Sequence, residues 1–281
     1  MFRIIVLLLF SLMTVMAADP IITVRSLDAD GIRLLPHGSS EFTAAAQTVA
    51  SIEERKALLP YTVLLKNTTN RNVIAYSVRW TPTGVDGIAV KPQLLTPRNF
   101  ITFRGGAAIA AGESKLVSFV DGLTLPPEAQ NPALHRRMLQ AAEFYRSQRS
   151  IEISLELVIL DDGTAIGPDQ DGKLAILKAW VDAERDFSRQ ALDVKDPEAF
   201  ASMVRQIRGE GFQMLGPEYP KTLNSLYLAA EISTEYEACF RFARSYFALQ
   251  VTDWIDQTDV KSAQQRLSSI TGTKQYPTIH R

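Results

Sequence analysis

The feature that most constrains this fold is a change in hydrophobic periodicity near residue 172. Before it, short runs rich in β-branched and aromatic residues alternate with Gly, Pro and Asn, which is typical of β-structure. After it, apolar residues recur every three or four positions, as on one face of an α-helix. The chain is therefore predicted to be an α+β protein, with a domain of β-strands over residues 18–171 and a helical region over residues 172–281.

The first region contains several runs in which apolar and polar residues alternate, as in half-buried strands. The expected strands are 21–27, 61–66, 73–80, 87–90, 100–103, 115–120 and 151–160, with a short helix or loop at 44–59. We expect 61–66 and 73–80 to pair as a β-hairpin across a polar turn. In 151–160 the odd-numbered apolar residues are expected to line one face, and Asp162-Gly163 predicts a turn into a short return strand at 165–166.

Helical spacing is present in one insertion and throughout the second region. A basic helical insertion is expected at about 126–149. The later helices are expected at 173–192, 197–208, 220–255 and 261–270, followed by a loose tail at 271–281. Asp196-Pro197 favours a helix start, and Gly209 and Gly211 are expected to lie beyond that helix. The long helix is expected to bury a stripe that begins at Leu228 and Ile232.

Three segments together resemble bacterial immunoglobulin-like β-sandwich domains. They are residues 61–80, the turn Gly112-Glu113-Ser114 with the run 116–119 after it, and residues 153–160. The resemblance covers roughly residues 20–170 and implies two antiparallel sheets packed face to face. This region has no cysteine for the disulfide of antibody domains, and the helical insertion departs from the compact form. It implies no reaction, because such sandwiches host many activities.

The N-terminal segment 1–17 has the layout of a secretory signal peptide. A positive Arg3 precedes the apolar run 4–16, and small residues allow cleavage near Ala18. A run of about 13 apolar residues is too short to span a bilayer, which needs roughly 20. Because the chain has a single cysteine, Cys239, we expect an exported bacterial protein of the periplasm or the medium rather than a disulfide-bonded eukaryotic one.

Charge and motifs argue against several function classes. Lys and Arg total 30 and Asp and Glu total 31, so the chain lacks the positive charge of a nucleic-acid binder. It carries no Gly-x-Ser-x-Gly elbow, and the Gly105-Gly106 pair lacks the lysine of a phosphate-binding loop. Cys239 lies on an apolar helical stripe, which favours a buried structural thiol. We therefore predict no catalytic residue and no cofactor.

Metal sites are not indicated by the histidines, because His37, His135 and His280 have no ligand at metal-binding spacing. Four aspartates crowd one loop: Asp161, Asp162, Asp169 and Asp171. Their pattern departs from a calcium-binding loop, since Gly167 and Lys178 stand where the first Asp and the bidentate Glu should be. A solvated hairpin loop is the favoured interpretation, with calcium as the alternative.

Two function classes follow from these patterns. The first is a non-catalytic binding or envelope-assembly protein whose partner is another protein or an envelope component. Phe242, Tyr246 and Trp254 are its predicted partner surface, with a helix-to-sandwich core as the alternative role for these aromatic residues. The second is a secreted hydrolase of envelope polymers that uses acidic residues at the junction of the two regions. The pairs Glu152/Glu156 and Glu231/Glu235 are compatible with it, although such pairs are common on solvated surfaces.

Overall fold

The computed structural model describes residues 19–27, 31–47, 53–95, 107–120, 132–233, 235–272, 274 and 276–281. The expected signal peptide and the expected strand at 100–103 lie outside these residues. Among the helices that are described, none is both long enough and apolar enough to cross a membrane.

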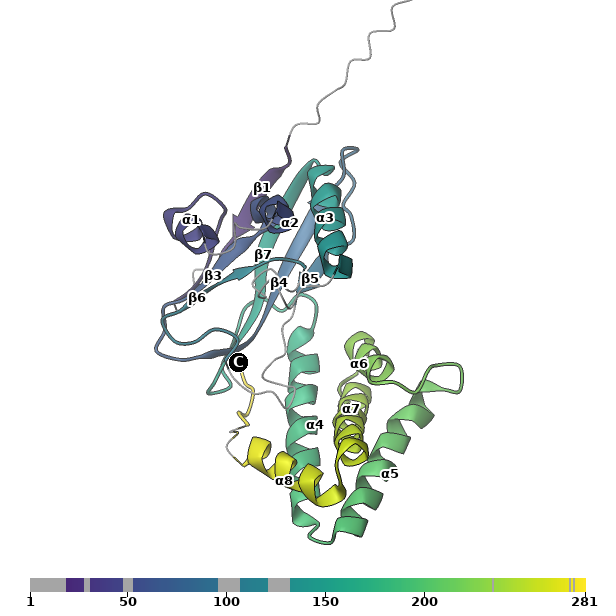
Figure 1. Ribbon diagram of the computed structural model, residues 1–281. Coiled ribbons are helices and arrows are strands. Elements are labelled where there is room, and N and C mark those ends of the chain that lie inside the picture. The colour runs from purple at the N-terminus through teal and green to yellow at the C-terminus, as the bar shows by residue number, and fades with distance from the viewer. Residues whose placement is uncertain are drawn as a thin grey trace, which may run out of the picture.

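The fold is α+β, as expected, with 50% helix and 21% strand (Figure 1). The strands are β1 (Ile21–Arg25), β2 (Ile32–Leu35), β3 (Val63–Asn67), β4 (Val73–Thr83), β5 (Gln93–Leu95), β6 (Ser114–Val117), β7 (Ser150–Leu160) and β8 (Ala165–Ile166). The α-helices are α1 (Ser40–Gln47), α2 (Glu53–Leu58), α3 (Pro132–Arg146), α4 (Lys173–Asp193), α5 (Pro197–Leu215), α6 (Leu223–Ile232), α7 (Tyr236–Gln257) and α8 (Val260–Thr271). A 3-10 turn, Leu59–Tyr61, precedes β3.

The strands form two sheets. The large sheet has the order β1-β7-β4-β5, and β8 pairs with the far end of β7. Its β1 runs parallel to β7, whereas its other pairs are antiparallel. The small sheet has the antiparallel order β2-β3-β6. The strand expected at 87–90 is wrong, because only an isolated bridge between Thr83 and Ala89 forms there.

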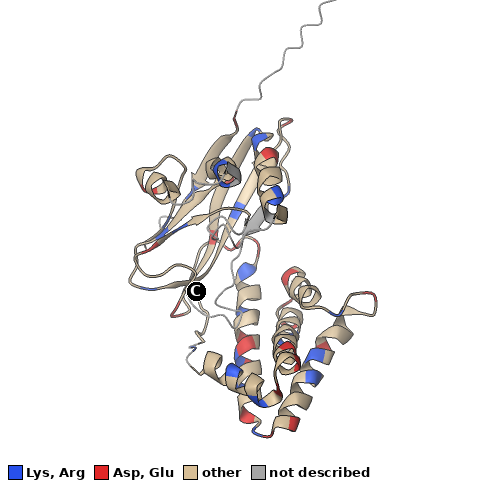
Figure 2. Ribbon diagram, viewed as in Figure 1, with Lys and Arg blue, Asp and Glu red and all other residues tan. Residues whose placement is uncertain are grey.

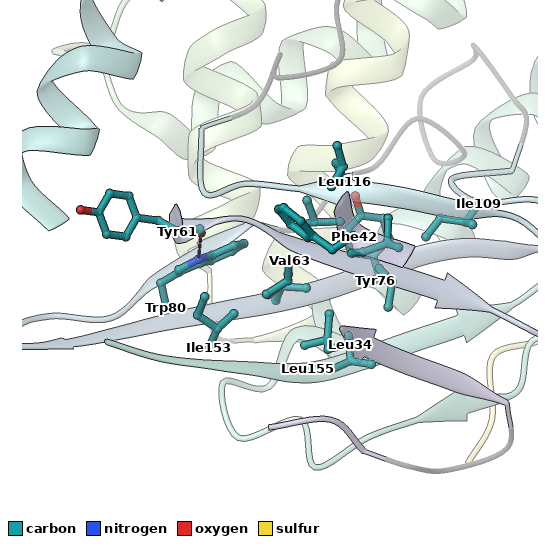
Figure 3. Close-up of a cluster of buried hydrophobic side chains, with 14 of the residues drawn as sticks. Leu34, Phe42, Tyr61, Val63, Tyr76, Trp80, Ile109, Leu116, Ile153 and Leu155 are labelled. Atoms are coloured by element: carbon teal, nitrogen blue, oxygen red, sulfur yellow. Dashed lines mark hydrogen bonds between the residues drawn. The ribbon is translucent and has the colours of Figure 1, made fainter. Parts of the chain in front are cut away.

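Both sheets contribute to one hydrophobic cluster, which we name the sheet core (Figure 3). Val63 of β3 and Leu116 of β6 belong to it together with Trp80 of β4 and Ile153 of β7. The indole N–H of Trp80 donates a 2.9 Å hydrogen bond to the carbonyl oxygen of Tyr61, so its only polar atom is satisfied in the core. Helix α3 lies in the segment expected to be helical, and its residues extend this core.

The expected hairpin of β3 and β4 is wrong, since the two strands belong to different sheets. Asn67 ends β3 and is fully buried. Its Nδ2 group donates hydrogen bonds to the carbonyl oxygens of Arg71, at 2.7 Å, and Ala110, at 3.0 Å. These bonds hold the connection as a corner between sheets rather than as a tight turn within one.

The single apolar face expected for β7 is also wrong. The pairing of β7 with β4 shifts between the Ser77–Leu157 and Val78–Leu155 pairs, which leaves Glu156 as a bulge. Ile153 and Leu155 therefore face the sheet core, whereas Leu157 and Ile159 face a second cluster. The bulge lets one strand supply two cores.

The second cluster, here the helix core, is built mainly by α4, α5, α7 and α8. Trp180, Phe200, Phe247 and Leu267 are fully buried in it. Ile74, Ala75, Leu157 and Ile159 from β4 and β7 complete it, so the helices pack on the large sheet. Asp196 caps α5 as expected, accepting a 2.8 Å hydrogen bond from the Ala199 N–H.

Helix α5 does not stop before Gly209 as expected, but continues to Leu215. A Cβ atom built on Gly211 would lie 2.4 Å from the Cβ of Ser245 on α7. The Ser245 hydroxyl donates a 2.7 Å hydrogen bond to the carbonyl oxygen of Ile207. Gly211 is therefore a close-crossing position between two helices and not a helix terminator.

The expected long helix 220–255 is in fact two helices. Helix α6 ends at Ile232, where Ser233 takes an extended conformation, and α7 starts at Tyr236. Helix α6 buries Leu226, Ala229 and Ala230, so the expected burial of Leu228 and Ile232 is wrong. Helical periodicity does not continue across a break between two helices. The positions of α6 that face the core therefore cannot be inferred from the apolar stripe of α7.

The tail expected to be loose makes specific contacts. We call Lys274 together with residues 276–281 the C-terminal segment; Figure 1 shows it rising from α8 toward the large sheet. Ile279 is buried in the helix core. His280 forms a parallel bridge with Thr164 beside β8.

Candidate functional site

A polar cluster lies at the junction of the large sheet and the helices, where β7 bulges. The Glu156 side chain is buried there, and its Oε1 accepts a 2.8 Å hydrogen bond from the Ser154 hydroxyl. The Arg79 Nε lies 3.7 Å from the same oxygen and 3.0 Å from Asp171 Oδ2. The Glu156 Oε2 is buried with no hydrogen-bond partner within the described residues. Such an oxygen can accept a hydrogen bond from a ligand.

The four crowded aspartates do not gather around one point. Each is engaged by donors of the protein: Asp161 by Asn72, Asp162 by Arg71, Asp169 by Leu174 and Arg281, and Asp171 by Arg79. Over the part of the chain that the structure describes, no group of three or more His, Cys, Asp or Glu side chains could hold a metal ion. The loop chemistry is that of turns, a helix cap and ion pairs.

A buried ion pair joins α4 to the C-terminal segment. The side chains of Glu184 and Lys274 are 1% and 5% exposed, and the Lys274 Nζ donates to Oε1 at 2.6 Å and to Oε2 at 2.7 Å. The Tyr276 hydroxyl donates to Oε1 at 3.2 Å and lies 3.4 Å from the Ser188 hydroxyl. Two donor groups therefore make three hydrogen bonds to one buried carboxylate.

Burial perturbs the ionisation of all three groups. Desolvation raises the pKa of Glu184 to about 7, although Lys274 and Tyr276 oppose the rise. Burial lowers the pKa of Lys274, against the attraction of Glu184. Burial and then the Glu184 charge raise the pKa of Tyr276. Perturbed groups can mark a reactive site, but here they hold a chain segment in place.

Two further networks cross-link α4 and α7. The Tyr236 hydroxyl donates a 2.7 Å hydrogen bond to Asp182, and burial, followed by this hydrogen bond and the charge of Asp182, raises the pKa of Tyr236. The Arg244 Nε lies 3.1 Å from Asp186 Oδ2, and its NH2 group donates to Gln190 Oε1 at 2.6 Å. These bonds fix the register of the two helices.

Four exposed apolar side chains of the described residues lie between the end of α5 and the end of α6, and the others are Ile21, Val85, Ile88 and Leu139. On α6, Leu228 is 49% and Ile232 is 79% exposed, and their four-residue spacing places them on one helix face. Met214 at the end of α5 and Tyr219 in the connection are exposed as well. Figure 1 shows this connection as a projecting loop. We call Leu228 and Ile232 the α6 apolar face.

The predicted partner-surface residues are half-buried. Phe242, Tyr246 and Trp254 all pack against the helix core. Tyr246 lies edge-on to Trp180, with ring centroids 5.2 Å apart, and the guanidinium of Arg266 lies 4.3 Å from the centre of the Trp254 ring. Their contact with a partner stays a prediction.

The remaining candidate residues lie apart from one another. Cys239 is buried, as expected, with its Sγ 3.7 Å from the carbonyl oxygen of Ile176. His37 contacts Phe42 edge-on, His135 lies on α3, and His280 lies in the C-terminal segment. Of the two predicted carboxylate pairs, Glu152 binds Arg25 and Glu156 faces Arg79, whereas Glu231 lies on α6 and Glu235 directly precedes α7.

Sequence reasoning missed both the buried Glu184–Lys274 pair and the α6 apolar face. The two ions are 90 residues apart, and no local motif links them. The α6 apolar face had a usable signal: the Ser-Thr pair at 233–234 inside the supposed long helix is a poor helix interior.

Charged residues are spread over the sheets and over the helices, without one dominant patch in this view (Figure 2).

Comparison with protein-family models, curated proteins and solved structures found no match to this chain.

Proposed function

We propose that this protein is an exported, non-catalytic binding or envelope-assembly protein, and that it binds a protein partner through the α6 apolar face. The observation that carries the proposal is the strong exposure of Ile232, at 79%, and Leu228, at 49%, on one face of α6. Full burial of a large aliphatic side chain contributes roughly 1.5–3 kcal/mol, and most of this for Ile232 and about half of it for Leu228 is forgone. Exposed apolar clusters of this kind are typical of interaction sites.

Export is part of the same proposal. The apolar run 4–16 and the small residues before Ala18 support cleavage of a signal peptide. Intact-mass measurement of the protein recovered from the periplasm or the medium tests it. We expect the mass of a chain that begins near Ala18. The mass of an uncleaved chain, recovered from the cytoplasm, would contradict export.

We also propose that the sheet region is a variant immunoglobulin-like sandwich. The support is the shared core of two sheets and the antiparallel pairs that dominate them. The parallel β1–β7 pair and the α3 insertion are the departures from the compact form.

Affinity capture with matched variants tests the binding proposal. Tagged mature protein is incubated with envelope extract of its own source, and captured proteins are quantified by mass spectrometry. We expect wild type to capture a stoichiometric partner. We expect Ile232→Asp to capture at least tenfold less of it. Val85→Asp is the matched control, because Val85 is 77% exposed on the connection between β4 and β5. Equal capture by wild type and Ile232→Asp rejects the α6 apolar face, and Phe242→Ala then tests the predicted aromatic surface.

A second candidate function, hydrolysis of an envelope polymer, is favoured by the buried Glu156 Oε2 described above. Glu156→Gln keeps the shape and the acceptor for Ser154 but removes the carboxylate. Loss of any polymer-cleaving activity in this variant, with Glu152→Gln as the control, supports the candidate. Activity equal to wild type in Glu156→Gln rejects it.

A further inference from the structure

The C-terminal segment meets the β7–β8 hairpin through its backbone. The Ala165 N–H donates a 2.7 Å hydrogen bond to the carbonyl oxygen of His280, and the His280 N–H donates a 3.0 Å bond to that of Gly163. His280 is thereby paired in parallel with Thr164, as an added strand would be. Main-chain bonds of this kind give affinity that depends little on the sequence of the added strand.

The hairpin is shaped to admit this backbone. Gly163 has φ +92°, and a Cβ atom built on it would lie 2.2 Å from the carbonyl oxygen of Thr278. Glycine is therefore required at position 163 both for the turn and for the approach of the segment. One residue further along, Ile279 is 7% exposed in the helix core. The site thus combines a strand edge with one apolar side-chain position.

The ion pair that joins α4 to this segment has a large desolvation cost. Glu184 and Lys274 both leave water to form their pair, and desolvation offsets much of the attraction between buried charges. The segment is also short. Its attachment combines a few hydrogen bonds, the buried side chains of Pro277 and Ile279, the packing of Tyr276 on the helix core and the ion pairs of Lys274 and Arg281.

We propose that the edge of the β7–β8 hairpin is a strand-addition site for an extended peptide with an apolar side chain, and that residues 276–281 occupy this site as a tethered internal ligand. A tethered ligand acts at an effective concentration on the order of millimolar, so it excludes a free peptide until it is displaced. This inference does not depend on the α6 apolar face. The peptide is recognised by its extended backbone and by a residue that can replace Ile279.

Peptide binding to the full chain tests the proposal. The probe is a fluorescent peptide with the sequence of residues 274–281, and the reported quantity is fluorescence anisotropy. Ile279→Asp weakens the internal ligand, so this variant is expected to bind the probe at least tenfold more tightly than wild type. A probe that carries the same substitution is expected not to bind. A folded Ile279→Asp chain that binds the probe no more tightly than wild type overturns the proposal.

A second variant keeps the test decisive if Ile279→Asp does not fold. His280→Pro removes the N–H that bonds to Gly163 and leaves Ile279 in place. Hydrogen exchange at Ala165 is expected to accelerate in this variant and to slow again when the probe is added. Unchanged exchange at Ala165 in His280→Pro, together with no gain in probe binding, overturns the proposal.

Discussion

Glu184 shows how burial sets the chemistry of a single residue. Its pKa rises from the ordinary 4.5 to about 7 because desolvation outweighs the attraction of Lys274. A carboxyl group whose folded pKa is raised contributes stability that is complete below its unfolded pKa and is lost as the pH rises through its folded pKa. For Glu184 this window runs from about pH 4.5 to about pH 7.

We predict that the free energy of unfolding of Glu184→Gln lacks this pH-dependent contribution. Across the window the contribution to wild type falls by up to about 3 kcal/mol as the pH rises. Urea unfolding at pH 4.5, 6 and 8 measures it. Glu143→Gln, on the exposed face of α3, is the control and should follow wild type. If the free energy of unfolding changes with pH by the same amount in wild type and in Glu184→Gln, the prediction is contradicted.

Gly163 allows a matched test of the C-terminal segment. Gly163→Ala is expected to release the segment, because the new Cβ would meet the carbonyl oxygen of Thr278. Gly112→Ala introduces similar backbone strain, at φ +75°, with nothing within 4 Å of the new Cβ. Hydrogen exchange measured by mass spectrometry should show lost protection at residues 276–281 only in Gly163→Ala. Equal protection in the two variants would count against the described contact.

At the scale of elements, the crossing of α5 and α7 gives opposite predictions for two neighbouring glycines. Gly209→Ala should stabilise the protein by up to about 1 kcal/mol, since alanine favours a helix and nothing lies within 4 Å of its Cβ. Gly211→Ala should destabilise it by roughly 1–3 kcal/mol, because its Cβ would overlap Ser245. Thermal and urea unfolding measure both. The same sign for the two substitutions would refute the close-crossing role of Gly211.

Local patterns predicted those elements whose signals are contained in a few residues. The Asp196 cap preceded a real helix, and alternation in 151–160 located β7. The Asp162-Gly163 turn correctly predicted the pairing of β7 with β8. The partners of β3 and β4 were not predictable, because the Asn67 corner and the Glu156 bulge depend on contacts far along the chain. Gly211 was misjudged for the same reason: its role is set by Ser245 on another helix.

The candidate sites were less predictable than the elements. Periodicity placed Leu228 and Ile232 in a buried stripe, and only the helix break at Ser233 explains their exposure. The pairing of Glu184 with Lys274 required knowing that the C-terminal segment returns along α4. Long-range placement of this kind leaves no periodic or motif signal in the sequence.

At the scale of the whole molecule, β4 and β7 connect the two cores. Leu157 and Ile159 complete the helix core, while their neighbours Val158 and Leu160 belong to the sheet core. A strand shared in this way cannot open on one side without losing burial on the other. The two cores are therefore expected to unfold together.

Native-state hydrogen exchange tests this coupling. Amides of β3 and of α7 should share one free energy of opening in wild type. Leu157→Ala should lower both by about 2–5 kcal/mol, because Leu157 is fully buried. Leu267→Ala, in α8, should lower both values as well, because a loss in the helix core is shared by the sheet core when the two unfold together. A β3 value that stays constant when the α7 value falls in Leu157→Ala would contradict the coupling.

The burial of Cys239 has a practical consequence. It is the chain's one cysteine, and its sulfur lies in the helix core against α4. An alkylating reagent can reach that sulfur only when α7 moves away from α4. The rate of alkylation therefore measures how often the two helices separate. The single native thiol therefore reports the opening of the helices, and its alkylation can be followed by mass without engineering a label.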